Sequence, residues 1–300
     1  GMIGLPIAIA LGVVCGESKK ELEVLCEGKN HVDEAKKWLE DHTVEIKPKD
    51  TLEKLYIECV CYGKNNYSKA IIAQSHTNFI HVQKNDTILL HKDISNNCEN
   101  KDACKDVLST LTAKEVYNYA VESKIEDLNW IFDTVKLNEE CSEKGLEGKY
   151  GLQIGRLLFN SDDKSERKEI IARTCAASDA RMDGITLPIY SNSGSGNQGI
   201  TCTLPIYFFG KKKGKSEEEI IRGLTLSHLM SIYIKSKIGR LSALCGAVNA
   251  SMGAASGIVY LSGGNFHQIC FAINNMINTI TGMVCDGAKP SCALKIATAL

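Results

Sequence analysis

The chain has 300 residues, of which 44% are hydrophobic and 24% charged, an ordinary composition for a globular protein. Its formal net charge of −1 leaves no excess of basic residues, so we expect no nucleic-acid partner. The 13 cysteines are an odd number and are irregularly spaced, which argues against a disulfide framework. Reduced thiols in the cytoplasm are the simpler interpretation, and clustered cysteines there point to a metal or to catalysis.

The first segment, residues 1–18, is an apolar run that contains Pro6. It has no basic stretch before it and no small-x-small cleavage pattern, so it predicts a buried helix rather than a signal peptide. We assign this helix to the helical domain described below and expect a cytoplasmic protein. Both ends of the chain stop within helical patterns, which indicates a chain truncated at both ends.

Residues 19–97 predict a small α+β domain. The stretch 19–42 is charged and has helical apolar spacing, which predicts surface helices. The stretch 43–95 contains short β-rich runs, among them "LYIECVCYG" and "TILLHK", separated by Asn, Gly, Lys and Asp. These runs predict a small antiparallel sheet with a helix packed on it.

Helical patterns dominate residues 98–300, which therefore predict a larger all-helical domain and an α+β fold for the chain. The span from Leu241 to Cys285 contains no Asp, Glu, Lys or Arg. Its length permits a membrane helix, but its many Asn, Ser and Gly residues and His267 are too polar for contact with lipid. We expect two buried helices here and no membrane partner.

The stretch "SNSGSGNQGI", residues 191–200, matches the dinucleotide fingerprint G-x-G-x-x-G. A nucleotide-binding oxidoreductase is therefore an alternative, although the fingerprint requires a βαβ unit and the surroundings here are helical. The preceding "ITLPIY" could supply the strand. Independently of that motif, a loop of small residues that opens a helix binds anions. The candidate carboxylate-binding residues are Ser193, Gly194, Ser195, Gly196, Asn197, Gln198 and Gly199.

Two further stretches carry candidate substrate-binding residues. In "ARTCAASDARMDG", Arg173 and Arg181 stand about two helical turns apart, so one face could present both to a carboxylate, with Asp179 between them. Surface salt bridges are the alternative.

In "QSHTNFIHV", strand periodicity places His76 on the opposite face from His81, so this spacing predicts no zinc pair. With Thr77 and Asn78, His76 could orient a substrate or transfer a proton. An ordinary half-buried histidine is the alternative.

Three cysteines stand at the edges of the charge-free span: Cys245, Cys285 and Cys292. Their intervals do not fit the short C-x-C pairs of zinc sites. Ligands contributed from helix ends around a Gly/Pro turn suit an iron–sulfur cluster. Buried free thiols are the alternative, since free cysteine is among the most buried residue types.

These stretches together closely resemble the L-cysteine desulfidase family, relatives of the α-subunits of bacterial iron–sulfur L-serine dehydratases. The matching segments run through nearly the whole chain and include "GMIGLPIAIALG", "SHTN", "RTCAASDARMDG", "LPIYSNSGSGNQGI", "GRLSALCGA" and "GMVCDGAKPSCALK". The resemblance implies a [4Fe–4S] cluster held by Cys245, Cys285 and Cys292, with the fourth iron open as a Lewis acid. Family members typically carry further segments at both ends, one with a Gly-Cys-Thr-Glu-Pro motif, that this chain lacks.

The implied reaction is the α,β-elimination of a small amino acid, L-cysteine or L-serine, to pyruvate, ammonia and sulfide or water. The loop and the arginines would bind the substrate carboxylate. His76 is the first candidate for proton transfer, followed by His228 and Lys289. An inactive remnant without a cluster is an alternative, as is a chain completed in a homodimer or by a complementary subunit.

Overall fold

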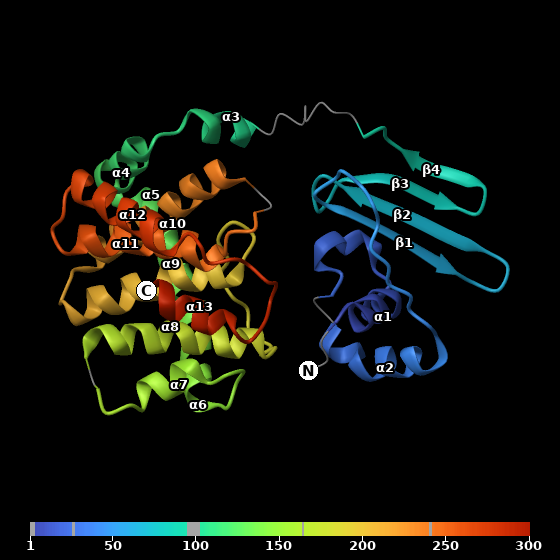
Figure 1. The fold of residues 1–300 in the computed structure, drawn as a ribbon, viewed down its shortest axis with the longest axis horizontal. Coiled ribbons are helices and arrows are strands. Elements are labelled where there is room, and N and C mark those ends of the chain that lie inside the picture. The colour runs from blue at the N-terminus through green and yellow to red at the C-terminus, as the bar shows by residue number, and fades with distance from the viewer. Residues whose placement is uncertain (1–3, 26–27, 95–102, 164, 240–241) are drawn as a thin grey trace. The chain divides into compact units, whose positions relative to one another are not determined.

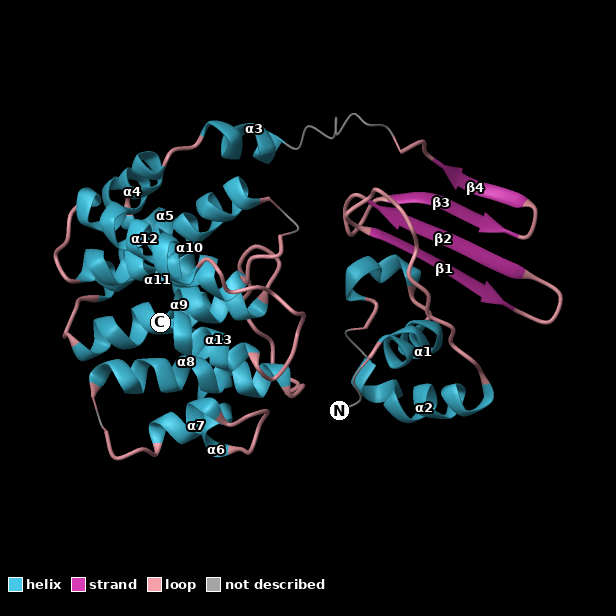
Figure 2. Cartoon of the chain, in the orientation of Figure 1, coloured by secondary structure: helices cyan, strands magenta, loops and turns pink. Residues whose placement is uncertain are grey.

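A computed structural model describes residues 4–25, 28–94, 103–163, 165–239 and 242–300. The chain divides into two compact units, Gly1–Asn100 and Lys101–Leu300, here called the sheet unit and the helical unit (Figure 1). The first holds an antiparallel sheet and the second is helical, which confirms the predicted α+β class (Figure 2). The boundary predicted between residues 97 and 98 lies outside the described residues.

The sheet unit is built from short helices followed by a meander of four strands in the order β1-β2-β3-β4. All neighbouring strands are antiparallel, as the alternating β-rich runs predict. The β3–β4 connection has only two residues between Lys84 and Thr87, and Asn85 takes the positive φ that such a tight turn requires. The elements are α1 (Leu5–Cys15), η1 (Ser18–Glu23), η2 (Gly28–His31), α2 (Val32–Asp41), β1 (Tyr56–Tyr62), β2 (Tyr67–Ala73), β3 (Phe79–Lys84) and β4 (Thr87–His91).

Helix α1 is held within the sheet unit by helix α2. Ile7 and Ala10 of α1 pack against Ala35 of α2, and all three side chains are buried. Since the two units are not placed relative to one another, the assignment of the 1–18 helix to the helical domain stays a prediction.

The helical unit surrounds α9 with α8, α10 and α11, and α6 and α7 pack on α8. Helices α9 and α10 contribute several of its largest fully buried side chains, among them Ile200, Leu204, Leu224 and Leu226. The elements are α3 (Ala103–Thr110), α4 (Ala113–Glu122), α5 (Ile125–Leu128), η3 (Asn129–Phe132), α6 (Asp133–Glu147), α7 (Ile154–Phe159), α8 (Glu166–Met182), α9 (Gly196–Lys212), α10 (Glu217–Ile238), α11 (Gly246–Leu261), α12 (Phe266–Ile280) and α13 (Cys292–Ala299).

The charge-free span forms α11 and α12, but only α11 is buried along its length. Helix α12 buries Ile269 and exposes Phe271 and Ile277, so the expectation of two buried helices was wrong for the second. Within the described residues, no helix combines the length and apolar character needed to cross a membrane. Pro205 lies buried inside α9, where packing on the surrounding helices outweighs the lost backbone hydrogen bond.

Candidate active site

The structure gathers the three predicted cluster cysteines at one end of the helical unit. Cys245 is the N-cap of α11, and Cys292 is the first residue of α13. The backbone N–H of Cys245 donates to the Met283 carbonyl at 2.9 Å, and that of Cys285 donates to the Ala243 carbonyl at 2.7 Å. This short ribbon brings residues 243–245 beside 283–285, although the two segments are far apart in sequence.

The three thiols influence one another electrostatically. Burial raises the pKa of Cys245, and the nearby Cys285 and Cys292 raise it further, while Lys295 opposes this effect. Lys295 donates to the Val284 carbonyl at 3.0 Å and forms an ion pair with Asp286, so it ties the Cys285 segment to α13. The Ala247 N–H at the start of α11 and Lys295 favour the Cys245 thiolate, but burial prevails, so metal binding there would have to release the thiol proton.

The three cysteines therefore fit a centre of soft metal ions, because thiolates are ligands of such ions and the three thiols lie near one another. As the side chains are placed, no three His, Cys, Asp or Glu residues among those described already form a metal-binding group. Cys285 lies on an exposed connection, whereas Cys245 is buried. The thiols are close enough to interact electrostatically.

The 191–199 loop opens α9 through a tight turn. Asn192 and Ser195 exchange backbone hydrogen bonds of 3.1 and 2.9 Å, and the two residues between them, Ser193 and Gly194, both have positive φ. This is the geometry of a type I′ turn, which small residues favour. The Ser195 hydroxyl then accepts from the Gln198 N–H and caps α9. The expected loop at a helix N-terminus is thus present.

Two glycines of the loop are required by close packing. A Cβ on Gly199 would lie 1.9 Å from the Tyr190 carbonyl oxygen. A Cβ on Gly196 would lie 2.3 Å from Nε of Arg181, so the guanidinium group rests against the first turn of α9. The glycines therefore serve close packing between backbone and side chains rather than a dinucleotide.

Arg181 stands out because its guanidinium group is half-buried and forms no ion pair with any described carboxylate. Burial lowers the pKa of Arg181, and the nearby Cys292 and Cys141 oppose this effect. A desolvated cation without an anionic partner is costly, and a bound anion would satisfy it. Arg181 thus links the α9 N-terminus to the thiols and offers a carboxylate a bidentate partner.

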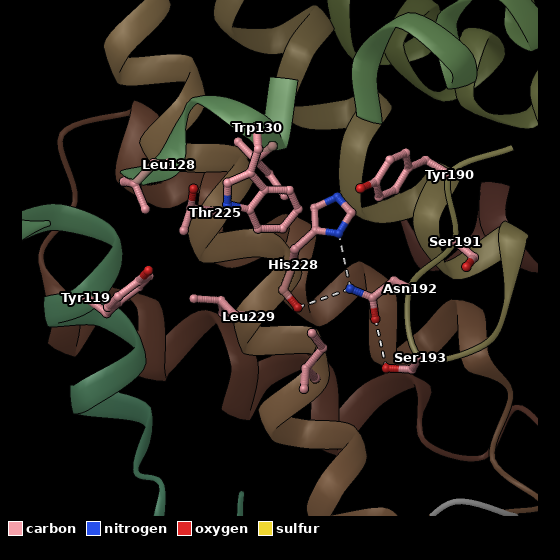
Figure 3. A pocket seen from close by; sticks show the side chains of 12 residues that line it. Tyr119, Leu128, Trp130, Tyr190, Ser191, Asn192, Ser193, Thr225, His228 and Leu229 are labelled. Carbon is pink, nitrogen blue, oxygen red and sulfur yellow. Dashed lines mark hydrogen bonds between the residues drawn. The ribbon is translucent and has the colours of Figure 1, made fainter. Parts of the chain in front are cut away.

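A network of buried polar residues holds the other side of the loop. Nδ2 of Asn192 donates to Nδ1 of His228 at 3.1 Å and to its carbonyl oxygen at 3.2 Å (Figure 3). Nε2 of His228 pairs with the Thr203 hydroxyl at 2.9 Å. Asn138 in turn donates to Thr203 at 3.3 Å. Burial lowers the pKa of His228 to about 4, so its ring is neutral near pH 7 with both nitrogens engaged.

A cavity of about 300 Å³ opens beside this network. Tyr119, Trp130 and Tyr190 stand around it, and Asn192 and His228 contribute its polar surface (Figure 3). No residue that lines it carries a charge at neutral pH, apart from a histidine held neutral by burial. The cavity therefore has room for a small molecule but offers no counter-charge to a carboxylate, in contrast to Arg181.

The remaining predicted residues on α8 have structural partners. Arg173 pairs with Glu169 at 3.2 Å and stacks on Phe208. The pair with Glu169 is the salt bridge that was the alternative to substrate binding for this residue. Asp179 is buried and accepts from the Gly155 N–H at 2.9 Å, at the N-terminus of α7. Burial raises the pKa of Asp179 to about 6. The pairing of Arg173 and Arg181 around one carboxylate is not what the structure shows, because Arg173 is occupied by Glu169.

The side chains of Asn197 and Gln198 are also engaged inside the helical unit. Asn197 accepts from the Ser178 hydroxyl at 3.3 Å, and Gln198 accepts from Asn249 at 3.0 Å. Gln198 packs against Gly246, the residue next to Cys245, so α9 and the Cys245 helix are coupled. The side-chain amide oxygen of Asn249, Oδ1, is buried without a hydrogen-bond partner.

His76, Thr77 and Asn78 lie in the sheet unit, whose placement relative to the thiols is not defined. His76 and Thr77 are exposed in the turn between β2 and β3, so the prediction that His76 lies within a strand, on the face opposite His81, was wrong. Asn78 closes this turn by donating to the Ala73 carbonyl at 3.0 Å. In the helical unit, Lys289 is exposed and pairs with Asp286 at 3.3 Å.

Sequence reasoning missed several residues that shape the site. Asn192, Thr203, Asn138 and Lys295 were not among the candidates, although Asn192 directly precedes the predicted loop. Polar residues within apolar helical stretches were the available signal, because such groups are buried only with partners. Residues 185–190, expected as a possible strand, form none, and the described helical unit contains no sheet, so the nucleotide-binding alternative lacks its βαβ unit.

Known proteins resemble this chain over nearly its whole length. The sequence model of the serine dehydratase alpha chain family matches residues 21–300. The chain is 47% identical to a UPF0597 protein of Phocaeicola vulgatus, over 99% of this chain and 70% of that protein. It is 44% identical to a UPF0597 protein of Bacteroides thetaiotaomicron and 41% identical to one of Clostridium perfringens, with the same coverage. No solved structure matches.

The matching family model indicates a lyase-type protein of amino-acid catabolism. The chain belongs to the serine dehydratase alpha chain family, as the resemblance in its sequence predicts.

Proposed function

We propose that this protein catalyses the iron–sulfur-dependent α,β-elimination of L-cysteine or L-serine to pyruvate, ammonia and sulfide or water. The observation that supports this most directly is the gathering of Cys245, Cys285 and Cys292. The last of these thiols is near Arg181, which lies against the first turn of α9. One end of the helical unit thus combines soft metal ligands with a cation that has no carboxylate partner among the described residues.

The three thiols would hold a [4Fe–4S] cluster through one cysteine each. When bound, the cluster would supply a Lewis acid that makes the substrate thiol or hydroxyl a better leaving group. Helix N-termini at Cys245 and Cys292 would stabilise the ligating thiolates. Lys295 would keep Cys285 close to α13 through the Val284 carbonyl.

Arg181 and the first N–H groups of α9 would bind the substrate carboxylate. The type I′ turn at Asn192–Ser195 fixes where that helix begins, and Ser195 caps it. Because the loop is held from behind by the Asn192–His228 hydrogen bond, it needs little reorganisation when substrate arrives. His228 therefore acts in this proposal as a positioning residue, since both its ring nitrogens are already hydrogen-bonded.

Proton transfer is proposed for His76, an exposed imidazole with Thr77 beside it, and Lys289 is the alternative. The base would remove the proton from the α-carbon while the β-substituent leaves as hydrogen sulfide ion or hydroxide. The resulting aminoacrylate tautomerises to an imine, and water releases ammonia and pyruvate. Substitution of His76 should slow proton removal without changing the colour of the loaded protein.

The test is anaerobic reconstitution of the whole chain with iron and sulfide, followed by assays of pyruvate from L-cysteine and from L-serine. We expect visible absorbance and turnover in the unchanged chain, and loss of both in Cys285→Ser. Cys270→Ser, a half-buried thiol outside the set, is the matched control and should keep both. An unchanged chain that folds but stays colourless would contradict the proposal and support a remnant without a cluster.

Arg181→Lys tests carboxylate binding separately from the cluster. Loss of a bidentate charged contact should raise KM by about 10-fold to 100-fold while the absorbance of the cluster stays unchanged. Arg173→Lys is the control, because that guanidinium group pairs with Glu169. Equal effects of the two substitutions on KM would remove Arg181 from the binding site.

A further inference from the structure

A histidine pair on the sheet unit lies outside everything described for the helical unit. His81 on β3 and His91 on β4 are directly opposite each other in the strand register. Their rings meet edge to face, with centroids 5.6 Å apart and an interplanar angle of 84°. The two Nδ1 atoms are 3.3 Å apart. What lies between them depends on which nitrogens carry protons.

The orientation of Gln83 settles this for His81. Nε2 of Gln83 donates to the Tyr67 hydroxyl at 2.8 Å and to the Asn85 carbonyl at 2.6 Å. Since a carbonyl can only accept, the amide nitrogen of Gln83 must face Asn85, and its Oε1 faces Nε2 of His81 at 3.0 Å. That ring nitrogen therefore donates. In a neutral imidazole, Nδ1 of His81 is then an unprotonated lone pair.

Asp93 has the corresponding effect on His91. Its Oδ1 lies 3.5 Å from Nε2 of His91, so a proton on that nitrogen points toward a carboxylate. With Nε2 protonated on both rings, the two Nδ1 lone pairs face each other and can share one cation. With the proton of His91 on Nδ1 instead, the same two atoms form a hydrogen bond.

We propose that His81 and His91 bind one divalent transition-metal ion, of which Zn²⁺ is the probe, through their Nδ1 atoms. Zinc–nitrogen bonds of about 2.0–2.1 Å at a tetrahedral angle separate two ligand nitrogens by about 3.3 Å, the spacing already present in the pair. Imidazole nitrogen is a ligand that zinc, copper and nickel prefer. Each ring also presents its second nitrogen to an oxygen, the arrangement that orients metal-binding histidines.

The site is open and exchangeable rather than a closed structural centre. No third His, Cys, Asp or Glu side chain completes the pair among the residues that the structure describes. Water would fill the remaining positions, and the exposed position of His91 at the end of β4 leaves room for it. Because the pair lies in the sheet unit, the inference stands independently of the elimination reaction proposed above.

The test uses the full chain with ¹⁵N-labelled histidine, titrated with Zn²⁺ at mildly alkaline pH and followed by NMR that detects each ring nitrogen. We expect protonated Nε2 on both rings without metal, and a joint shift of both Nδ1 resonances on addition of Zn²⁺. Each ring reports separately, so zinc held by thiols elsewhere does not obscure the result. His91→Ala should abolish the shift at His81.

Two further variants separate chelation from general surface binding. Gln83→Leu removes the oxygen that orients His81 and should weaken zinc binding about 10-fold without removing either ligand. His76→Ala, an exposed histidine in the β2–β3 turn, is the matched control and should leave both shifts unchanged. The proposal is overturned if either ring carries its proton on Nδ1 without metal, if saturating Zn²⁺ leaves both Nδ1 signals in place, or if His91→Ala leaves the His81 shift intact.

Discussion

The two units handle polar groups in opposite ways. In the sheet unit, ionisable side chains pair on the surface, as Glu58 does with Lys69 at 2.7 Å and Lys49 at 3.5 Å. In the helical unit, Asp179 and His228 are almost completely buried, and their pKa values move toward the neutral form. The difference follows from architecture, because a single sheet leaves one face to water whereas α9 is enclosed by other helices. Buried polar groups are therefore where small changes should matter most.

The largest expected effect comes from adding a methyl group at Gly199. Its Cβ would lie 1.9 Å from a backbone carbonyl oxygen that has no room to move, so Gly199→Ala should destabilise the protein by about 4 kcal/mol or prevent folding. Gly12, in helix α1 of the sheet unit, has nothing near the corresponding position. Gly12→Ala should instead stabilise by about 0.5–1 kcal/mol through helix propensity. Chemical denaturation measures both, and equal effects would contradict the comparison.

The second prediction concerns the pH dependence that burial creates. Asp179 has its pKa raised from 3.8 to about 6, so the folded state holds more protons in this range and stability falls as pH rises through it. His228 has its pKa lowered from 6.5 to about 4, so the unfolded state holds more protons and stability rises with pH through nearly the same range. Each contribution is about 3 kcal/mol, and in the unchanged protein they oppose each other.

Removing either group should reveal the pH dependence of stability that the other group causes. Relative to the unchanged protein, Asp179→Asn should make stability increase with pH between about pH 4 and about 6, whereas His228→Gln should make it decrease. The melting temperature measured across this range gives the sign directly. Slopes of the same sign in the two variants would show that at least one of these groups is solvated.

The smallest expected effect is on the sheet surface. Lys69 is the main cause of a lowered pKa of Glu58, to about 2, with the Tyr56 hydroxyl contributing. The stabilisation is complete above the usual carboxyl pKa of 4.5 and is lost as pH falls toward 2. Because Glu58 is partly exposed, solvent screens the pair, and Lys69→Met should cost only about 1 kcal/mol at neutral pH. Added salt should reduce that cost further, as measured by denaturation.

Local sequence patterns were sufficient to predict most of the strands and helices. The alternating runs of residues 43–95 predicted the antiparallel strands, because side-chain period and turn residues are properties of neighbouring positions. They could not place His76, because nothing local distinguishes the last residues of a strand from the start of its turn. The exposure of α12 was missed for a similar reason, since an apolar composition does not state which helix will cover it.

The site was predictable in part. The loop and its glycines were identified from composition, yet the partner of each polar side chain depended on packing between distant segments. The sequence predicted Arg173 and Arg181 equally as carboxylate ligands. In the structure, Arg173 pairs with Glu169, whereas Arg181 lies against Gly196.

The sequence by itself determined the α+β class and the helix that begins at the 191–199 loop, since these rest on residue type and spacing. It identified the candidate thiols through the family resemblance. Tertiary structure alone decided that the Cys245 and Cys285 segments pair through an antiparallel bridge, that Asp179 and His228 are buried, and that His81 faces His91. The physical reason is that desolvation and charge proximity are set by which surfaces pack together, and no single segment of the chain contains that information.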